Sequence, residues 1–109
     1  MVQRVCEFYK AIHILGSKIP KKDRFGIFLK IENICLELLD LIISASFENR
    51  NLKIPLLKTA RIKIEVLKRL IRISFDLKII EMGKYIESES ELQEISKMTN
   101  GWIKYLGNI

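Results

Sequence analysis

Residues 58–80 read KTARIKIEVLKRLIRISFDLKII, a segment that is rich both in cations and in Ile, Leu and Val. At about 100° per residue, a helix places these cations within one sector that is about 100° wide. This cationic stripe consists of Lys58, Arg61, Lys68, Arg69 and Arg72, and Glu65 and Asp76 fall in the same sector. The apolar residues sweep roughly 200°, about twice the width of an ordinary amphipathic face. A helix that is buried only in its own bundle does not need so much apolar surface.

The apolar residues of this helix form two sets. One set is Leu57, Ala60, Ile64, Leu67 and Ile71, and the other is Val66, Leu70, Ile73 and Leu77. Residues 21–47 show the same excess, because their polar stripe is only about 80° wide. That polar stripe consists of Lys30, Asn33, Glu37, Asp40 and Ser44. A monomer would expose apolar faces this broad, so the pattern predicts a homo-oligomer, for which a ring is a natural form.

Four helical segments with short breaks account for nearly the whole chain. We expect them over residues 2–15, 21–47, from 51–54 to 77, and 82–106. Pro55 is expected in the first turn of the third helix, where its missing N–H costs nothing. Gly101 lies inside the last helix and either weakens it locally or lets a neighbour approach closely. The short connections predict a single all-α domain over residues 1–109, folded as an antiparallel up-down-up-down four-helix bundle.

The charge of the chain is concentrated in the third segment. The whole chain has a formal net charge of +6, and residues 53–78 alone contain eight Lys or Arg and two acids. A second basic group consists of Lys21, Lys22 and Arg24. This distribution favours a polyanionic partner, although charge alone does not distinguish nucleic acid from acidic protein or membrane.

A solvated helix face is the alternative interpretation of the cationic stripe. Such faces usually mix acids and bases at i,i+4 spacing. Here only Glu65 has a convincing basic partner, in Lys68 or Arg69. The sequence favours a binding surface, and both interpretations stay open.

The cysteines and the apolar runs indicate the cellular compartment of the protein. Cys6 and Cys35 both lie in apolar periodic segments, which is typical of reduced, buried thiols. No apolar run reaches the ~18–20 residues that span a bilayer, because Asp40 interrupts the longest one. The N-terminus lacks the apolar core of a signal peptide. The sequence therefore predicts a soluble, cytoplasmic protein with no membrane partner.

No catalytic site, metal site or cofactor is expected. His13 is the only histidine and is expected to be partly buried between helices. Two turns of helix separate it from Cys6, too far for a nucleophile pair, and two or three scattered ligands do not make a zinc site. Glu32 is expected to be partly buried, either paired with Arg24 or with a cation of a neighbouring subunit, or simply at the edge of the core. Sequence motifs for phosphate loops and nucleophile elbows are absent, so the chain is not expected to be an enzyme.

Several short motifs, in this order, resemble the accessory variability determinant (Avd) family of diversity-generating retroelements. They are Pro20…Arg24…Ile31-Glu32, Leu67…Leu70-Ile71-Arg72 and Glu94-Ile95…Gly101-Trp102. The similarity runs from about Phe8 to Leu106. The chain departs from the family at Ile43-Ser44-Ala45-Ser46, where Ala or Glu is frequent. The family lies within a superfamily of four-helix bundles that includes the proteins encoded in intervening sequences of 23S ribosomal RNA genes.

The resemblance implies a function that the residues alone do not. Members are small basic bundles that form homopentameric rings, associate with a reverse transcriptase and its template RNA, and support error-prone complementary-DNA synthesis. By this resemblance the contacts for nucleic acid or polymerase are Lys58, Arg61, Lys68, Arg69 and Arg72, with Lys21, Lys22 and Arg24 as a second basic site. The alternative is a structural bundle of the ribosomal intervening-sequence type, which has no direct role with a polymerase.

Overall fold

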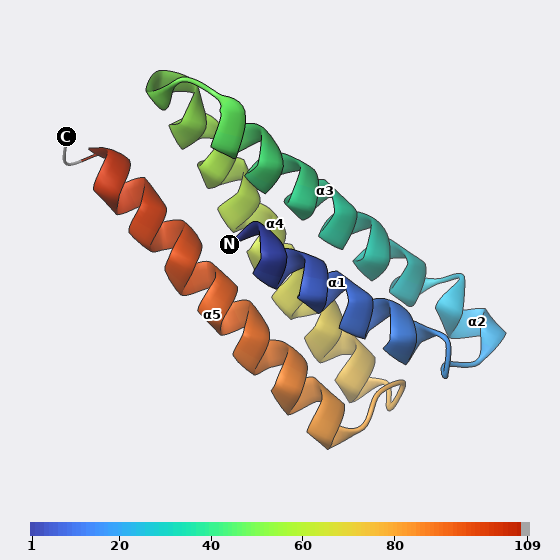
Figure 1. Ribbon diagram of the computed structural model, residues 1–109. Coiled ribbons are helices and arrows are strands. Elements are labelled where there is room, and N and C mark those ends of the chain that lie inside the picture. Colours follow the sequence, from blue (N-terminus) through green and yellow to red (C-terminus); the bar gives the residue numbers. More distant parts are fainter. Residues whose placement is uncertain (108–109) are drawn as a thin grey trace.

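The computed structural model describes residues 1–107, and these fold as an antiparallel four-helix bundle with one additional short helix (Figure 1). The helices are α1 (Val2–Gly16), α2 (Lys21–Arg24), α3 (Ile27–Phe47), α4 (Arg50–Asp76) and α5 (Met82–Gly107). No strand lies within the described residues. The predicted all-α fold is confirmed.

Neighbouring long helices run in opposite directions. Between α3 and α4, Glu37 pairs with Lys63 near the middle, and Ala45 is bonded by Lys53 at the end. Between α1 and α5, Arg4 pairs with Glu91. The order around the bundle is therefore α1, α3, α4 and α5. Figure 1 shows that α1 covers only part of the bundle length, because it has 15 residues whereas α5 has 26.

The core is built from one apolar side of each long helix. On α4 the predicted first set is buried: Leu57, Ala60, Ile64, Leu67 and Ile71. α3 contributes the largest share: Phe28, Ile31, Ile34, Cys35, Leu38, Ile42 and Ala45. The two fully buried hydroxyl groups are satisfied within their own helices, as Ser74 donates to the carbonyl oxygen of Leu70 and Thr99 to that of Ile95. Only one side of each long helix therefore packs into the core of its own bundle.

The prediction of one continuous helix over residues 21–47 is wrong, because the chain breaks at Phe25 and Gly26. The guanidinium of Arg24 donates to the carbonyl oxygens of Gly16, Ser17 and Ile19, at 3.2, 3.0 and 3.0 Å. These bonds hold α2 against the end of α1, where helix carbonyls lack partners. These bonds to the preceding turn accompany a break in a segment whose local pattern favours a single helix.

Two further expectations about helix interiors are resolved. α4 begins at Arg50, so Pro55 lies beyond the first turn, and the prediction that it lies in the first turn is wrong. A Cβ atom added to Gly101 would meet nothing within 4 Å, so this glycine does not serve a close approach. It leaves an exposed position of α5 without the helix stabilisation that a side chain supplies.

Candidate nucleic-acid interface

The cationic stripe lies on the outer surface of α4, along the seam with α5. Lys68 Nζ donates to Gln93 Oε1 of α5 at 3.0 Å and to Glu65 Oε1 at 3.4 Å. Arg72 Nη1 donates to the hydroxyl oxygen of Tyr85, also on α5, at 3.4 Å. The five predicted residues share one face of α4, and two of them reach side chains of α5; we call this face the α4–α5 seam.

Arg72 is held at one end of this seam. Its Nε donates to Asp76 Oδ1 at 3.1 Å, an ion pair that the sequence analysis did not expect. Its guanidinium also lies near the rings of Tyr85 and Phe75, which stack with centroids 4.7 Å apart. The hydrogen bond to Tyr85, followed by the charge of Asp76, raises the pKa of Arg72. This cation is fixed in position and already neutralised in part.

The other cations of the seam are open to a ligand. Within residues 1–107, Lys58, Arg61 and Arg69 are exposed and make no ion pair or side-chain hydrogen bond. Unpaired surface cations attract phosphate without first losing an internal partner. The seam thus has two kinds of cation: Lys68 and Arg72, which are paired, and three that are unpaired.

A shallow depression of about 490 Å³ lies between two of the unpaired cations. It is lined by Arg61, Ile62, Glu65, Val66 and Arg69 from α4, and by Asn100 from α5. Sequence reasoning missed Asn100. Its spacing of seven residues from Gln93 places both amides on one side of α5, and this periodicity was the available signal.

The second basic group does not join the seam. α2 packs against α3, away from the α4–α5 side (Figure 1). Lys21 and Lys22 are exposed there, whereas Arg24 is half-buried and bonded to the end of α1. Arg24 therefore has a structural task in this fold.

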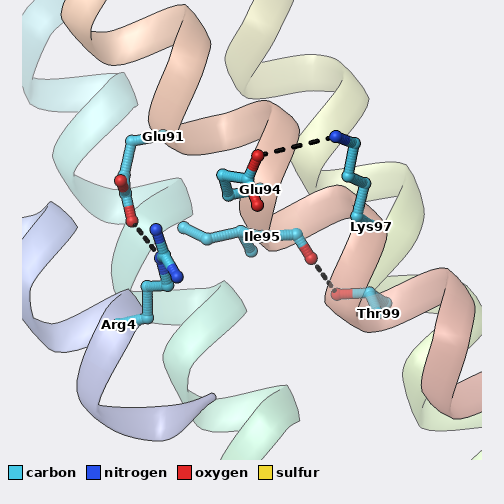
Figure 2. A network of polar contacts seen from close by, with 6 residues as sticks. All are labelled: Arg4, Glu91, Glu94, Ile95, Lys97 and Thr99. Atoms are coloured by element: carbon cyan, nitrogen blue, oxygen red, sulfur yellow. Dashed lines mark hydrogen bonds and ion pairs between the residues drawn. The ribbon is translucent and has the colours of Figure 1, made fainter.

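Two acids of α5, Glu87 and Glu91, lie on the side of the helix that faces α1. Figure 2 shows Arg4 Nε bonded to Glu91 at 2.7 Å and Glu94 paired with Lys97 at 3.6 Å. A groove between α1 and α5, of about 520 Å³, is lined in part by Glu7, Glu87 and Glu91. The same groove is lined by Lys18 and Lys84, and Glu7, Glu87 and Glu91 all lie in ion pairs, so the α1–α5 side carries both signs, whereas unpaired cations lie on the seam.

Glu32 and His13 form a pair that the sequence analysis did not anticipate. His13 Nδ1 lies 2.6 Å from Glu32 Oε1, joining α1 to α3. Glu32 is partly buried as predicted, but its partner is not Arg24. The prediction that His13 is partly buried is wrong, since 65% of its side chain is exposed. The short α1 leaves the ring at the bundle surface.

Two apolar stripes remain on the outside of the bundle. The α3 outer stripe consists of Leu29, Leu36 and Ile43, and the α4 outer stripe of Ile73 and Leu77, whereas Val66 lines the depression on the seam. Leu36, Ile73 and Leu77 are 44%, 43% and 64% exposed. The predicted second apolar set of α4 is therefore outside the core, with Leu70 half-buried beside it.

Other kinds of site find little support in the described part of the chain. Among residues 1–107, no three His, Cys, Asp or Glu side chains gather as a metal ion would require. No helix in the same range is both long and apolar enough to cross a membrane.

Comparison with known families explains this combination of features. The sequence model of the bAvd-like family matches residues 1–106, almost the whole length of the chain. The chain belongs to the bAvd-like family. This bAvd-like protein has no match among curated proteins or solved structures. The match confirms the resemblance to Avd proteins, a family of accessory proteins.

Proposed function

We propose that this bAvd-like protein is a non-enzymatic accessory subunit of a diversity-generating retroelement. It binds the reverse transcriptase and the template RNA as a homo-oligomeric ring, in the cytoplasm, and supports mutagenic complementary-DNA synthesis. Family membership supports the biological setting. The observation that supports RNA binding is the α4–α5 seam, where Lys58, Arg61 and Arg69 are exposed beside an apolar depression.

The ring is supported by the two outer stripes. Large exposed apolar residues on two helices are more than a small soluble monomer usually carries. Acids flank the α3 outer stripe, where Asp40 is exposed and Glu32 half-buried, whereas α4 is cationic beside its stripe. Packing of α3 against α4 of the next copy brings opposite charges together, and packing of α3 on α3 brings like charges together. A head-to-tail contact of this kind closes into a ring, and the family resemblance points to a pentamer.

The ring repeats the seam in every subunit. Each copy contributes its seam, so the number of phosphate contacts grows with the number of subunits. Binding to RNA is therefore expected to be tight at low salt and to weaken steeply as salt rises. Lys21 and Lys22 lie apart from the seam and provide a second place for RNA or for the polymerase to touch.

A charge-matched pair of variants tests the RNA-binding face. The triple variant Lys58→Ala/Arg61→Ala/Arg69→Ala removes the unpaired cations of the seam. The control Lys10→Ala/Lys18→Ala/Lys30→Ala removes the same charge from α1, the α1–α2 connection and α3. Circular dichroism and light scattering first establish that both variants fold and assemble like the parent.

Fluorescence anisotropy with a labelled structured RNA then separates the outcomes. We expect the seam variant to lose at least about tenfold in affinity and to show a shallower salt dependence, while the control stays close to the parent. Equal affinities of the two variants would overturn the assignment of the seam. A structural role of the ribosomal intervening-sequence type would then be the better interpretation.

A further inference from the structure

The depression on the α4–α5 seam is lined by more kinds of side chain than phosphate binding requires. Two apolar side chains, Ile62 and Val66, and two arginines, Arg61 and Arg69, line it. A carboxylate, Glu65, and an amide, Asn100, complete the lining, and both are exposed to solvent. A site that only attracted phosphate would gain nothing from a carboxylate, which repels it. The arrangement suits a ligand with an anionic backbone, a flat apolar face and a hydrogen-bonding edge.

A nucleotide of single-stranded RNA has all three properties. Its base has an aromatic face for the apolar side chains, and its edge is free for side-chain hydrogen bonds when it is unpaired. In an RNA duplex the faces of the bases are stacked and their Watson–Crick edges are paired, so neither is free for contact with the apolar side chains and the hydrogen-bonding groups of this depression. The depression therefore fits an unpaired base better than a double helix.

The spacing of the two arginines agrees with this ligand. Arg61 and Arg69 are eight residues apart on α4, which corresponds to about 12 Å along the helix axis. Glu65 lies halfway between them on the same face, and Asn100 borders the depression from α5. Phosphates at the two arginines would thus flank a base that lies between them.

We propose that this depression binds an unpaired base of single-stranded RNA, and that Glu65 and Asn100 favour bases carrying an exocyclic amino group over uracil. This inference rests on the proposed RNA-binding function and names the part of the RNA that the seam recognises. Glu65 accepts a hydrogen bond from the amino group, as carboxylates do with cytosine, and the Asn100 amide donates to a ring acceptor. Uracil has only one donor on this edge, set between two carbonyl oxygens that repel a carboxylate.

A neighbouring depression on the same seam provides the contrast. It is lined by Tyr85, Ile86, Glu89, Ser90 and Gln93, all from α5. No cation lines it, and the two cations that bond to its lining residues, Lys68 and Arg72, are already in ion pairs. Two arginines without ion pairs, Arg61 and Arg69, distinguish the first depression from this one. Glu89 is therefore a matched control for Glu65.

The experiment compares two oligonucleotides that differ at the base edge. Fluorescence anisotropy is measured with labelled ten-nucleotide oligocytidylate and oligouridylate, and with a blunt RNA duplex as a third probe. For the parent protein we expect cytidylate to bind about fivefold more tightly than uridylate, which is the low end of the discrimination that one hydrogen-bonded base contact provides. The duplex should bind no more tightly than uridylate. Glu65→Gln and Asn100→Ala should each bring the two pyrimidine affinities to within about twofold, with an unchanged salt slope. Glu89→Gln should keep the parent's ratio.

The ratio of affinities keeps this inference separate from the proposed function. Glu65→Gln also removes the ion-pair partner of Lys68. This change strengthens the binding of both oligonucleotides alike and leaves the ratio of their affinities unaffected. If the parent binds both pyrimidines equally, or if Glu65→Gln and Asn100→Ala keep the discrimination, the base-reading site is wrong while RNA binding stands. If no RNA probe binds at low salt, the proposed function itself fails.

Discussion

Lys53 Nζ donates to the carbonyl oxygen of Ala45 over 2.7 Å, so the first turns of α4 close the end of α3. The last carbonyls of a helix have no partner within it, and its C-terminus carries partial negative charge. Cations also bond to the carbonyl oxygens at two other helix ends, since Arg24 donates to Gly16 of α1 and Arg50 donates to Leu106 of α5. Some cations of this basic protein therefore stabilise the bundle, and they must be separated from those that are free to bind RNA.

Replacing Lys53 with methionine tests this stabilising role. Lys53→Met keeps most of the apolar stem and removes the charge at the end of α3, and we expect a loss of about 1 kcal/mol in the free energy of unfolding. Urea denaturation at one fixed protein concentration measures it, and the fluorescence of Trp102, whose ring centroid lies 5.6 Å from Lys53 Nζ, follows the same region. The control is Lys58→Met on the same helix, which is expected to stay within about 0.5 kcal/mol of the parent. Equal losses in the two variants would show that general charge, and not the cap, matters.

The two glycines at positions 16 and 101 are expected to respond to alanine with opposite signs. Gly101 is exposed within α5 and an added Cβ meets nothing, so Gly101→Ala should stabilise by about 0.5–1 kcal/mol. Gly16 is buried, and an added Cβ would lie 3.1 Å from Cδ1 of Phe28, itself only 1% exposed. Gly16→Ala should therefore destabilise, by about 1 kcal/mol or more. Thermal and urea unfolding of both variants give the two signs, and a destabilising Gly101→Ala would contradict the open surroundings of that residue.

Cys35 is expected to resist thiol reagents until the protein unfolds. Burial, and to a lesser extent the charge of Glu32, raises the pKa of the Cys35 thiol to about 12. Relative to an ordinary thiol, the thiolate fraction at pH 8 is then smaller by about a thousandfold. In a Cys6→Ala variant, in which Cys35 is the only cysteine, we expect no labelling under native conditions and full labelling in denaturant. Rapid native labelling would contradict the burial of this side chain in the core.

The same thiol makes stability depend on alkaline pH. Below the ordinary thiol pKa of 9.0 both states are protonated, so stability does not vary on this account. Above it, the unfolded chain loses the proton while the folded chain keeps it, so stability falls between pH 9 and about pH 12. Comparing Cys6→Ala with Cys6→Ala/Cys35→Ala isolates this fall, which should be shallower in the double variant. Identical slopes would show that other groups control the alkaline range.

The periodic features of this fold are predictable from the sequence, whereas the side-chain contacts between its helices are not. The core side of α4 follows from helical spacing, because burial of that side depends only on the period of the helix. The break at Gly26 is accompanied by bonds from Arg24 to carbonyls of the preceding turn, and the pairing of His13 with Glu32 joins residues 19 positions apart. No local pattern specifies such contacts, so they became visible only in the folded chain.

The candidate site divides in the same way. The cations of the stripe are placed correctly by the wheel, since all of them belong to one helix. Which of them are already paired depends on α5, through Gln93 and Tyr85, and so does the presence of Asn100 in the depression. A single-helix argument finds the face but not the partners that come from across the seam.

A mixing experiment tests the head-to-tail assembly. Leu36→Gln damages the α3 outer stripe and Ile73→Gln damages the α4 outer stripe, and each variant alone should run as a monomer in light scattering or native mass spectrometry. If α3 of one copy packs against α4 of the next, a mixture of the two variants retains one intact contact, between α4 of the first and α3 of the second. The mixture should therefore form heterodimers that do not close into rings.

The control for this experiment is Ile14→Gln on α1. Ile14 is 58% exposed but faces the α1–α5 groove, outside both stripes, so this variant should assemble like the parent. If the α3 stripe packed on its own copy, Ile73→Gln alone would still form dimers, and the mixture would add nothing to them. A parent protein that is itself monomeric would leave the outer stripes without a partner, and the ring would have to be abandoned.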